Sequence, residues 1–233
     1  MYAKPREAIH CPQPAPTPPF SRDSPRTDMV RRTKAEAEQT RSLILDTAER
    51  LFFTKGVSRT TLAEIATATG LTRGAIYWHF ANKLELFNAM HERVALPFTE
   101  AMEKLLHAED PLAALRERCV LDLQDIAACP QLQQVLAVLL HKCEYVDELG
   151  ELCLRFDQQN KCFVEHSETV LARAHALGQL RDGVEPRRAA IALHNYMLGT
   201  ISDWLFAPDL RYRLADEAGP LVDLFFAGLE RPA

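Results

Sequence analysis

A twenty-residue segment, 61–80, constrains the fold of this chain more than any other part of the sequence. It reads TLAEIATATGLTRGAIYWHF, which has the spacing of two short helices joined at a tight turn. Ala66 is small enough for two helices to cross, Gly70 can take the positive φ that the turn needs, and Ile76 can anchor the second helix. With Ile76 inward, the polar residues around it cannot all be buried. The segment predicts a helix-turn-helix whose second helix presents its N-terminal side outward, to a major groove.

Helical patterns continue on both sides of this segment. Apolar residues between Ile44 and Phe52 share one helical face, and Gly56 is a suitable left-handed end for that helix. Three further helix starts carry residues suited to N-terminal capping: Thr61 with Glu64, Thr72, and Asn82 with Glu85.

The rest of the chain also has helical periodicity, and no strand pattern survives. We expect the helices to break at six Gly or Pro positions: Asp110–Pro111, Cys129–Pro130, Gly178, Glu185–Pro186, Pro208 and Gly219–Pro220. The predicted fold class is all-α, with about nine helices in total. A three-helix N-terminal domain that carries the helix-turn-helix is followed by a larger helical domain.

Composition separates a tail from these two domains. Residues 1–28 hold seven of the fourteen prolines and show no period of 3.6 or 2, so a disordered Pro-rich tail is expected. Met29 opens a natural-looking beginning, MVRRTKAEAEQTR, and we hypothesise that the tail reflects an upstream choice of start codon. Residues 29–98 are then the expected DNA-binding domain, and residues 99–233 the larger domain.

Charge is distributed unequally between the two domains. Residues 29–90 carry nine Lys or Arg against six Asp or Glu, whereas residues 91–233 carry fourteen against twenty-three. A basic N-terminal domain joined to a larger acidic domain suits a nucleic-acid-binding protein whose larger domain is repelled by phosphate.

The last two helical segments predict a second copy of the chain as a partner. Residues 186–206 are amphipathic, and residues 221–229 are apolar nearly all round. Two such helices at the end of a chain need a surface to cover them, and a second copy of the chain in a homodimer is the simplest source of that surface.

The segments RSLILDTAERLFFTKGVSR and TTLAEIATATGLTRGAIYWHFANKLELFNAM together resemble the DNA-binding domain of the TetR family of bacterial transcriptional repressors. The resemblance covers about residues 38–98. VRRTKAEAEQTR, GAIYWHFANK and the later HKCE at 141–144 are more narrowly similar to the AcrR/TtgR branch, which represses multidrug efflux pumps. The resemblance implies a dimer on palindromic double-stranded operator DNA, released by a small-molecule effector.

The helix-turn-helix and the resemblance together assign roles in DNA binding. Arg73 can bridge guanine O6 and N7, and Gly74 allows close backbone approach, although helix packing is an alternative reason for this glycine. The resemblance makes Tyr77, His79 and Lys83 contacts to phosphate or thymine methyl, with Trp78 either a contact or a packing residue. The predicted DNA-binding residues are Thr61, which would offer its hydroxyl and backbone N–H to phosphate, Thr72, Arg73, Gly74, Tyr77, Trp78, His79 and Lys83.

The larger domain is expected to bind a hydrophobic or cationic effector such as a drug, a dye or a plant phenolic. In the family, effector binding swings the fourth helix and changes the spacing of the two recognition helices. Leu136 and Leu140 are aliphatic where some relatives have polar pocket residues. The candidate ligand-binding residues, each with plain core as the alternative, are Cys119, Leu136, Leu140, Phe163, His194 and Met197.

Catalysis, cofactors and metals are not expected. The chain has no GxSxG, GxGxxG, P-loop or HExxH motif. His141, Cys143, Glu144, Asp147, Glu151 and Cys153 are metal-ligand types, but their spacing fits no compact zinc pattern. The rival functions that remain are a TetR-like regulator of another pathway, including redox or electrophile sensing, and a ligand-independent DNA-binding protein. Against the second rival, some 135 residues beyond the DNA-binding domain are more than dimerisation alone needs.

The same sequence predicts a cytoplasmic protein with no membrane partner. The longest unbroken apolar run, Val135 to Leu140, is far shorter than a membrane span, and the N-terminus lacks the apolar stretch of a signal peptide. The six cysteines are therefore expected in a reducing compartment rather than in a disulfide framework.

Overall fold

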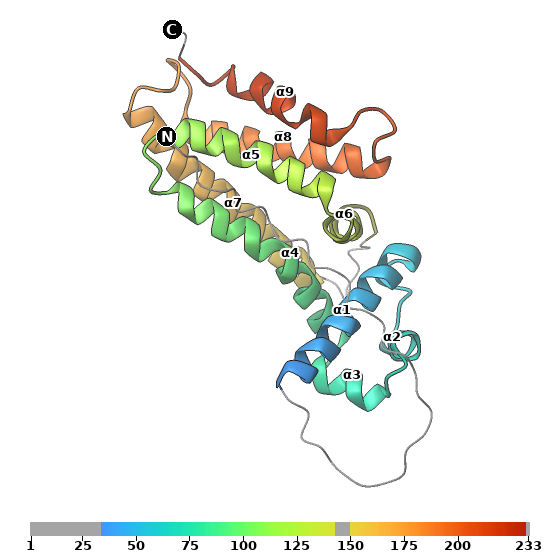
Figure 1. Ribbon diagram of the computed structural model, residues 1–233. Helices are drawn as coiled ribbons and strands as arrows, with labels where there is room; N and C mark the ends of the chain where they lie inside the picture. Colours follow the sequence, from blue (N-terminus) through green and yellow to red (C-terminus); the bar gives the residue numbers. More distant parts are fainter. Residues whose placement is uncertain (1–33, 143–149, 232–233) are drawn as a thin grey trace.

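The computed structural model describes residues 34–142 and 150–231, and all of its regular elements are helical (Figure 1). The predicted tail, 1–28, lies outside the described residues. The elements are α1 (Lys34–Lys55), α2 (Leu62–Thr69), α3 (Arg73–His79), α4 (Lys83–Leu105), α5 (Pro111–Ala128), α6 (Pro130–Ala137), the π-helical turn η1 (Val138–Lys142), α7 (Gly150–Ala176), α8 (Pro186–Phe206) and α9 (Leu214–Phe226). The predicted all-α class is confirmed.

The local signals around the helix-turn-helix act as the sequence predicts. Thr61 caps α2 in a capping box, in which the Glu64 N–H donates to the Thr61 hydroxyl over 3.2 Å. Gly70 ends α2 in the left-handed conformation, with φ at 71°. Thr72 accepts from the Ala75 N–H at the start of α3, and Asn82 accepts from the Glu85 N–H at the start of α4. These contacts satisfy N–H groups that a helix start leaves without an intrahelical partner.

Two buried apolar clusters hold the chain together. The N-terminal core joins α1 to α4 and is built around side chains such as Ile44, Phe52, Ile76 and Phe87. The C-terminal core joins α4 to α9, with Leu123 fully buried within it. Burial of apolar area is the dominant favourable contribution to folding, so each cluster stabilises its own set of helices.

Two elements, α4 and α6, belong to both clusters. In α4, Met90 is part of the N-terminal core and Met102 part of the C-terminal core. In α6 and the turn that follows it, Leu132 packs in the C-terminal core, whereas Val135 and Val138 are fully buried in the N-terminal one. The two cores are therefore connected through α4 on one side and α6 on the other.

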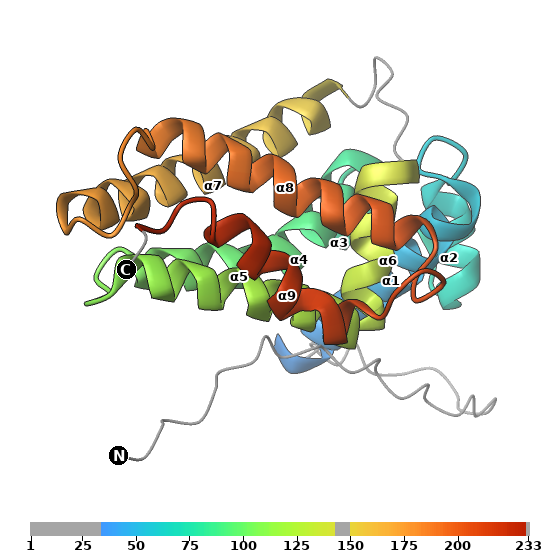
Figure 2. The same ribbon diagram turned by 90° about the horizontal axis from the view of Figure 1, so that it is seen from above.

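The C-terminal helices form a layered bundle above the N-terminal ones. Helix α7 packs along α8, and α5 packs along α9 (Figures 1 and 2). Helices α8 and α9 lie on the outer side of this bundle, and they retain exposed apolar residues. Ile191 of α8 and Leu224 of α9 are 42% and 74% exposed.

The predicted break at Gly219–Pro220 is wrong, because Pro220 lies inside α9. A proline inside a helix removes one hydrogen bond and normally kinks or ends the helix. Here Leu214, Ala218, Val222 and Phe226 recur every four residues and are all buried on one face, while Pro220 is exposed. The packing of that face offsets the missing backbone hydrogen bond.

Candidate DNA-binding surface and ligand cavity

Helix α3 is anchored by one face and exposed on the other. Ile76 is fully buried and Phe80, directly after the helix, is 1% exposed, so both fix α3 on the N-terminal core. Thr72, Arg73 and Gly74 are exposed at the start of the helix. The short helix therefore displays its first turn to solvent, as a groove-reading helix must.

Gly74 has no packing reason to be a glycine. A Cβ atom added there would meet only the Thr72 Oγ1 atom, at 3.9 Å, which is an ordinary contact. This space gives no support to the alternative that the glycine is needed for helix packing. Close approach of the backbone to DNA stays a prediction.

Aromatic side chains extend the exposed surface of α3. Tyr77 is 56% and Trp78 is 72% exposed. The Trp78 ring stands edge-on to His79, with centroids 4.5 Å apart, and His79 is half-buried beneath it. A tryptophan this exposed contributes little to the core, so packing does not account for it.

Two residues predicted to touch phosphate also make contacts within the protein. The Thr61 N–H and hydroxyl both donate to Glu64 Oε2, over 2.9 and 3.0 Å. Lys55 lies 2.8 Å from the other oxygen of Glu64, and these partners lower the pKa of that carboxyl to about 2. A phosphate contact by Thr61 would compete with the ionised Glu64 carboxylate for the same N–H and hydroxyl, and it stays a prediction.

Lys83 is the second such residue. Its ammonium donates to the carbonyl oxygens of Val57 and Ser58, over 3.1 and 3.2 Å. These bonds tie the start of α4 to the loop between α1 and α2. A phosphate contact by Lys83 stays a prediction, with a structural role now beside it.

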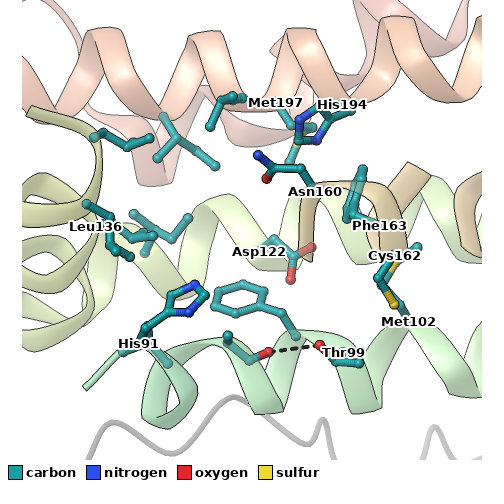
Figure 3. Close-up of a pocket in the computed structure, with 18 of the residues that line it drawn as sticks. His91, Thr99, Met102, Asp122, Leu136, Asn160, Cys162, Phe163, His194 and Met197 are labelled. Carbon is teal, nitrogen blue, oxygen red and sulfur yellow. Dashed lines mark hydrogen bonds between the residues drawn. The ribbon is translucent and has the colours of Figure 1, made fainter. Parts of the chain in front are cut away.

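A cavity of about 190 Å³ lies in the C-terminal bundle between α4, α5, α6, α7 and α8 (Figure 3). Five of the six residues proposed from the sequence line it, from three different helices and the turn after α6: Leu136, Leu140, Phe163, His194 and Met197. The sixth, Cys119, does not line the cavity and is 1% exposed in the C-terminal core. The structure brings the five together, and their role in ligand binding remains a prediction.

Most of the polar lining of this cavity escaped the sequence analysis. It comes from α4, α5 and α7: His91, Thr99, Asp122, Asn160, Cys162 and His166. No local pattern in the sequence distinguishes these residues from polar residues that face solvent. Asp122 lies three residues after Cys119, but Arg118 and Asp125 share its helical face, so nothing in the sequence marks it as a cavity residue.

Burial governs the protonation of the cavity's titratable groups. Desolvation raises the pKa of the Asp122 carboxyl to about 7, although the nearby Arg118 guanidinium opposes this shift. The same desolvation lowers the pKa values of His91 and His194. Near neutral pH these two imidazoles are therefore uncharged, and Asp122 is poised between its neutral and ionised forms.

In the part of the chain that the structure describes, no group of three or more His, Cys, Asp or Glu that could hold a metal is found. Of the metal-ligand types between His141 and Cys153, most lie outside the described side chains. Cys119 and Cys162 are free, whereas Cys129 is disulfide-bonded, which departs from the reduced state expected for all six.

Among the described helices none is both long and apolar enough to cross a bilayer.

The fold and its two sites define a class of protein. A helix-turn-helix that exposes its second helix is joined, through α4 and α6, to a helical body that contains a small cavity. This is the plan of a ligand-responsive DNA-binding regulator.

Comparison with known proteins identifies the family within this class. Residues 44–90 match the model for bacterial regulatory proteins of the tetR family, and residues 110–230 match the C-terminal region of the MAATS-type transcriptional repressors. The chain belongs to the TetR family of transcriptional regulators. The family and the relatives below are regulators of transcription, not enzymes.

Three relatives are similar over most of their length. The transcriptional regulator TtgR of Pseudomonas putida is 39% identical over 78% of this chain and 87% of its own. NalD, the secondary repressor of the MexAB-OprM multidrug efflux pump in Pseudomonas aeruginosa, has a crystal structure with 40% identity and a TM-score of 0.79, over 86% of this chain and 100% of NalD. The SmeT–triclosan complex is 32% identical with a TM-score of 0.76, over 83% and 93%; SmeT represses the SmeDEF multidrug efflux pump of Stenotrophomonas maltophilia. The resemblance to the TetR family and its AcrR/TtgR branch is confirmed.

Proposed function

We propose that this chain is a cytoplasmic repressor of a multidrug efflux operon. It leaves its operator when a small hydrophobic or cationic effector enters the cavity between α4 and α8. The observation that carries the proposal is that one helix, α4, connects an exposed recognition helix to an apolar cavity. NalD and SmeT, which repress efflux pumps, support the choice of operon.

Operator recognition would rest on the exposed first turn of α3. Arg73 is exposed there and is placed to read a guanine, whereas Gly74 lets the backbone approach the bases. Thr72, Tyr77, Trp78 and His79 would contact the sugar–phosphate backbone or thymine methyl groups. Such contacts fix the register of a protein on DNA but carry little sequence information.

A homodimer would present two copies of α3 to a palindromic operator. We assign its interface to α8 and α9, because Ile191 and Leu224 leave apolar area exposed on these neighbouring helices. A two-fold dimer places its recognition helices about 34–36 Å apart, one turn of the DNA helix. Effector binding would act by changing this spacing.

Coupling between the cavity and α3 would pass through α4 and α6. A buried polar network joins these helices to α1: the Arg93 guanidinium lies 2.7 Å from Asp46 Oδ1 and 3.3 Å from Glu49 Oε1. Gln131 of α6 donates to Glu49 Oε2 over 2.8 Å. A ligand that moves α4 or α6 changes this network and so biases the position of the N-terminal helices. A coupling of 1–3 kcal/mol, the usual range, alters affinity roughly 5- to 150-fold.

The proposal is tested by DNA binding to the region upstream of this gene and of any adjacent transporter genes, measured by fluorescence anisotropy at several salt concentrations. Arg73→Ala should weaken specific binding by about 1–3 kcal/mol and relax preference at one base pair. Lys83→Ala should weaken binding to every sequence and reduce the salt slope by about one. Arg213→Ala, an exposed arginine in the loop before α9, is the matched control. Equal loss on specific and random DNA for Arg73→Ala would falsify the base-reading role.

A further inference from the structure

The polar contacts of the cavity do not come from α6 or η1, where Leu136 and Leu140 provide only aliphatic surface. They come from other helices, and Asp122 of α5 is the one carboxylic acid among the described lining residues. Figure 3 places its carboxyl at the centre of the group, between Thr99 of α4 and Asn160 of α7. An aspartate in this position is unexpected, because burying a charge is costly unless the charge is paired and hydrogen-bonded.

The pairing of Asp122 within the protein is incomplete. Its Oδ1 atom lies 2.7 Å from Arg118 Nη2, yet that atom accepts no aligned hydrogen bond. The same Arg118 nitrogen donates to Asp125 Oδ2 over 3.2 Å. One guanidinium is thus shared by two carboxyl groups, and all three side chains are at most 14% exposed.

The buried trio therefore has a surplus of negative charge when both carboxyl groups are ionised. Arg118 supplies one positive charge, and Asp122 and Asp125 supply two negative charges. His91 and His194, which line the same cavity, are uncharged near neutral pH because burial lowers their pKa values. Among the described side chains, Arg118 is the sole cation within ion-pair distance of Asp122. A positive charge placed in the cavity beside Asp122 would balance the trio.

We propose that Asp122 is the ligand-anchoring residue of this cavity and that the cavity takes a small aromatic or aliphatic amine, with its ammonium on Asp122 and its apolar body among Phe98, Ile126, Leu136 and Phe163. This inference rests on the proposed function in that the cavity is taken as the effector site. It narrows the effector from a hydrophobic or cationic compound to a compound that is both.

The size of the cavity sets the size of the ligand. A cavity of 150 Å³ lined by apolar side chains holds benzene in another protein. The volume here, about 190 Å³, leaves room for one ring and a short chain. A charge-assisted hydrogen bond among these mostly apolar side chains is stronger than a neutral one, and this difference would select the amine over a neutral compound of the same shape.

The experiment uses a matched pair of probes and calorimetric titration of the full chain at pH 8. The probes are 2-phenylethylamine and 2-phenylethanol, which have the same shape and differ in charge. The wild-type protein should bind the amine at least tenfold more tightly than the alcohol. Asp122→Asn keeps the volume and removes the charge, so it should abolish this preference and leave the affinity for the alcohol within about threefold.

Asp125→Asn is the matched control. It removes an equal charge from the same arginine but does not line the cavity, so it should retain the preference for the amine. Asp122→Leu is a second variant in case the asparagine does not fold, because Arg118 keeps Asp125 as an ion-pair partner after the substitution. Melting temperatures and far-UV circular dichroism establish that each variant is folded.

Two outcomes would overturn the assignment of Asp122 as the ligand-anchoring residue. One is a wild-type protein with no preference for the amine, and the other is a preference that survives both substitutions of Asp122. Release from DNA is measured separately with the same proteins. If a different compound releases the operator while the amine has no advantage, the anchor is wrong and the repressor function stands. If the amine binds through Asp122 without weakening DNA binding, the anchor stands and the effector role of the cavity fails.

Discussion

The functional polar residues lie outside the apolar core in the N-terminal part of this molecule, whereas those of the C-terminal part line a cavity within the helical bundle. In the N-terminal part, Ile76 and Phe80 close the core, and Arg73 and Trp78 lie outside it on α3. In the C-terminal part, the polar groups of His91, Asp122 and His194 line a space left open within the bundle. The same element, α4, forms a wall of both.

This difference bears on how each site gains affinity. A recognition helix must hold its side chains in register with a rigid partner, so a closed core beneath it is an advantage. A cavity must accept a ligand that supplies the missing contacts, so unfilled volume is part of its function. The N-terminal core should therefore be intolerant of changes in volume, and the cavity wall tolerant of them.

Truncation of one side chain at each end should produce the largest contrast. Ile76→Ala removes a fully buried side chain from the N-terminal core and should lower the free energy of unfolding by about 2–5 kcal/mol. Leu198→Ala removes a half-buried side chain that already borders the cavity, so a smaller loss of about 1–2 kcal/mol is expected. Urea denaturation followed by circular dichroism measures both. Equal losses would mean that the cavity wall is as tightly packed as the N-terminal core.

Enlargement of a small residue should show the same contrast from the opposite change in volume. Ala66 of α2 is 4% exposed, so Ala66→Leu inserts atoms into a closed core. The overpacking should cost about 1–3 kcal/mol of stability and weaken DNA binding. Ala95→Leu points its added atoms into the cavity, so stability should stay within about 1 kcal/mol of wild type. The cavity would shrink, and binding of 2-phenylethylamine should fall. A strongly destabilised Ala95→Leu protein would show that the cavity is not available volume.

The pH dependence of stability should sharpen the comparison at the junction of the two ends. Burial raises the pKa of Glu49 from 4.5 to about 7, although Arg93 opposes this shift. Between these two values the folded protein binds one more proton than the unfolded chain, so stability falls as pH rises from about 4.5 to 7. The expected fall is of the order of 1–3 kcal/mol. Glu49→Gln should reduce the slope of melting temperature against pH but not abolish it, because Asp122, whose pKa burial also raises to about 7, contributes over the same range. The exposed Glu38→Gln should leave the slope unchanged.

The smallest effect is expected at Lys83. Its ammonium bonds two loop carbonyls at partly exposed positions, so Lys83→Ala should lower the stability of the DNA-free protein by about 1 kcal/mol. Lys55→Ala, which removes an exposed ion pair with Glu64, should cost less. If Lys83→Ala leaves the melting temperature unchanged, Lys83 has no structural role and belongs to the DNA-binding surface alone.

The sequence predicted the N-terminal site better than the cavity, for a physical reason. The helix-turn-helix is encoded by neighbours within a few residues, such as Thr61 with Glu64, and by the turn glycine Gly70. Its exposed residues follow once Ile76 is assigned to the core. The cavity is a tertiary feature that five helices build together, and no local period records which face of each helix meets it.

Helix α5 illustrates that limit. Cys119 and Asp122 lie one turn apart, and the sequence analysis selected the cysteine as a ligand-binding residue. An aspartate is normally exposed, so a pattern of apolar residues assigns it to solvent. The structure instead buries Asp122 at the cavity and Cys119 in the core beside it. Only the positions of the other helices decide between the two.

The burial of Val135, Val138 and Leu139 in the N-terminal core has a consequence for protein engineering. Regulators of this family invite the exchange of DNA-binding and sensing parts, and the predicted boundary near residue 98 is the obvious crossover point. A chimaera joined there would pair the N-terminal helices with a foreign α6, and mismatched side chains would fill the space that these three residues occupy. A hybrid that carries residues 135–139 from the same parent as its DNA-binding helices should fold better than one that recombines at residue 98 alone.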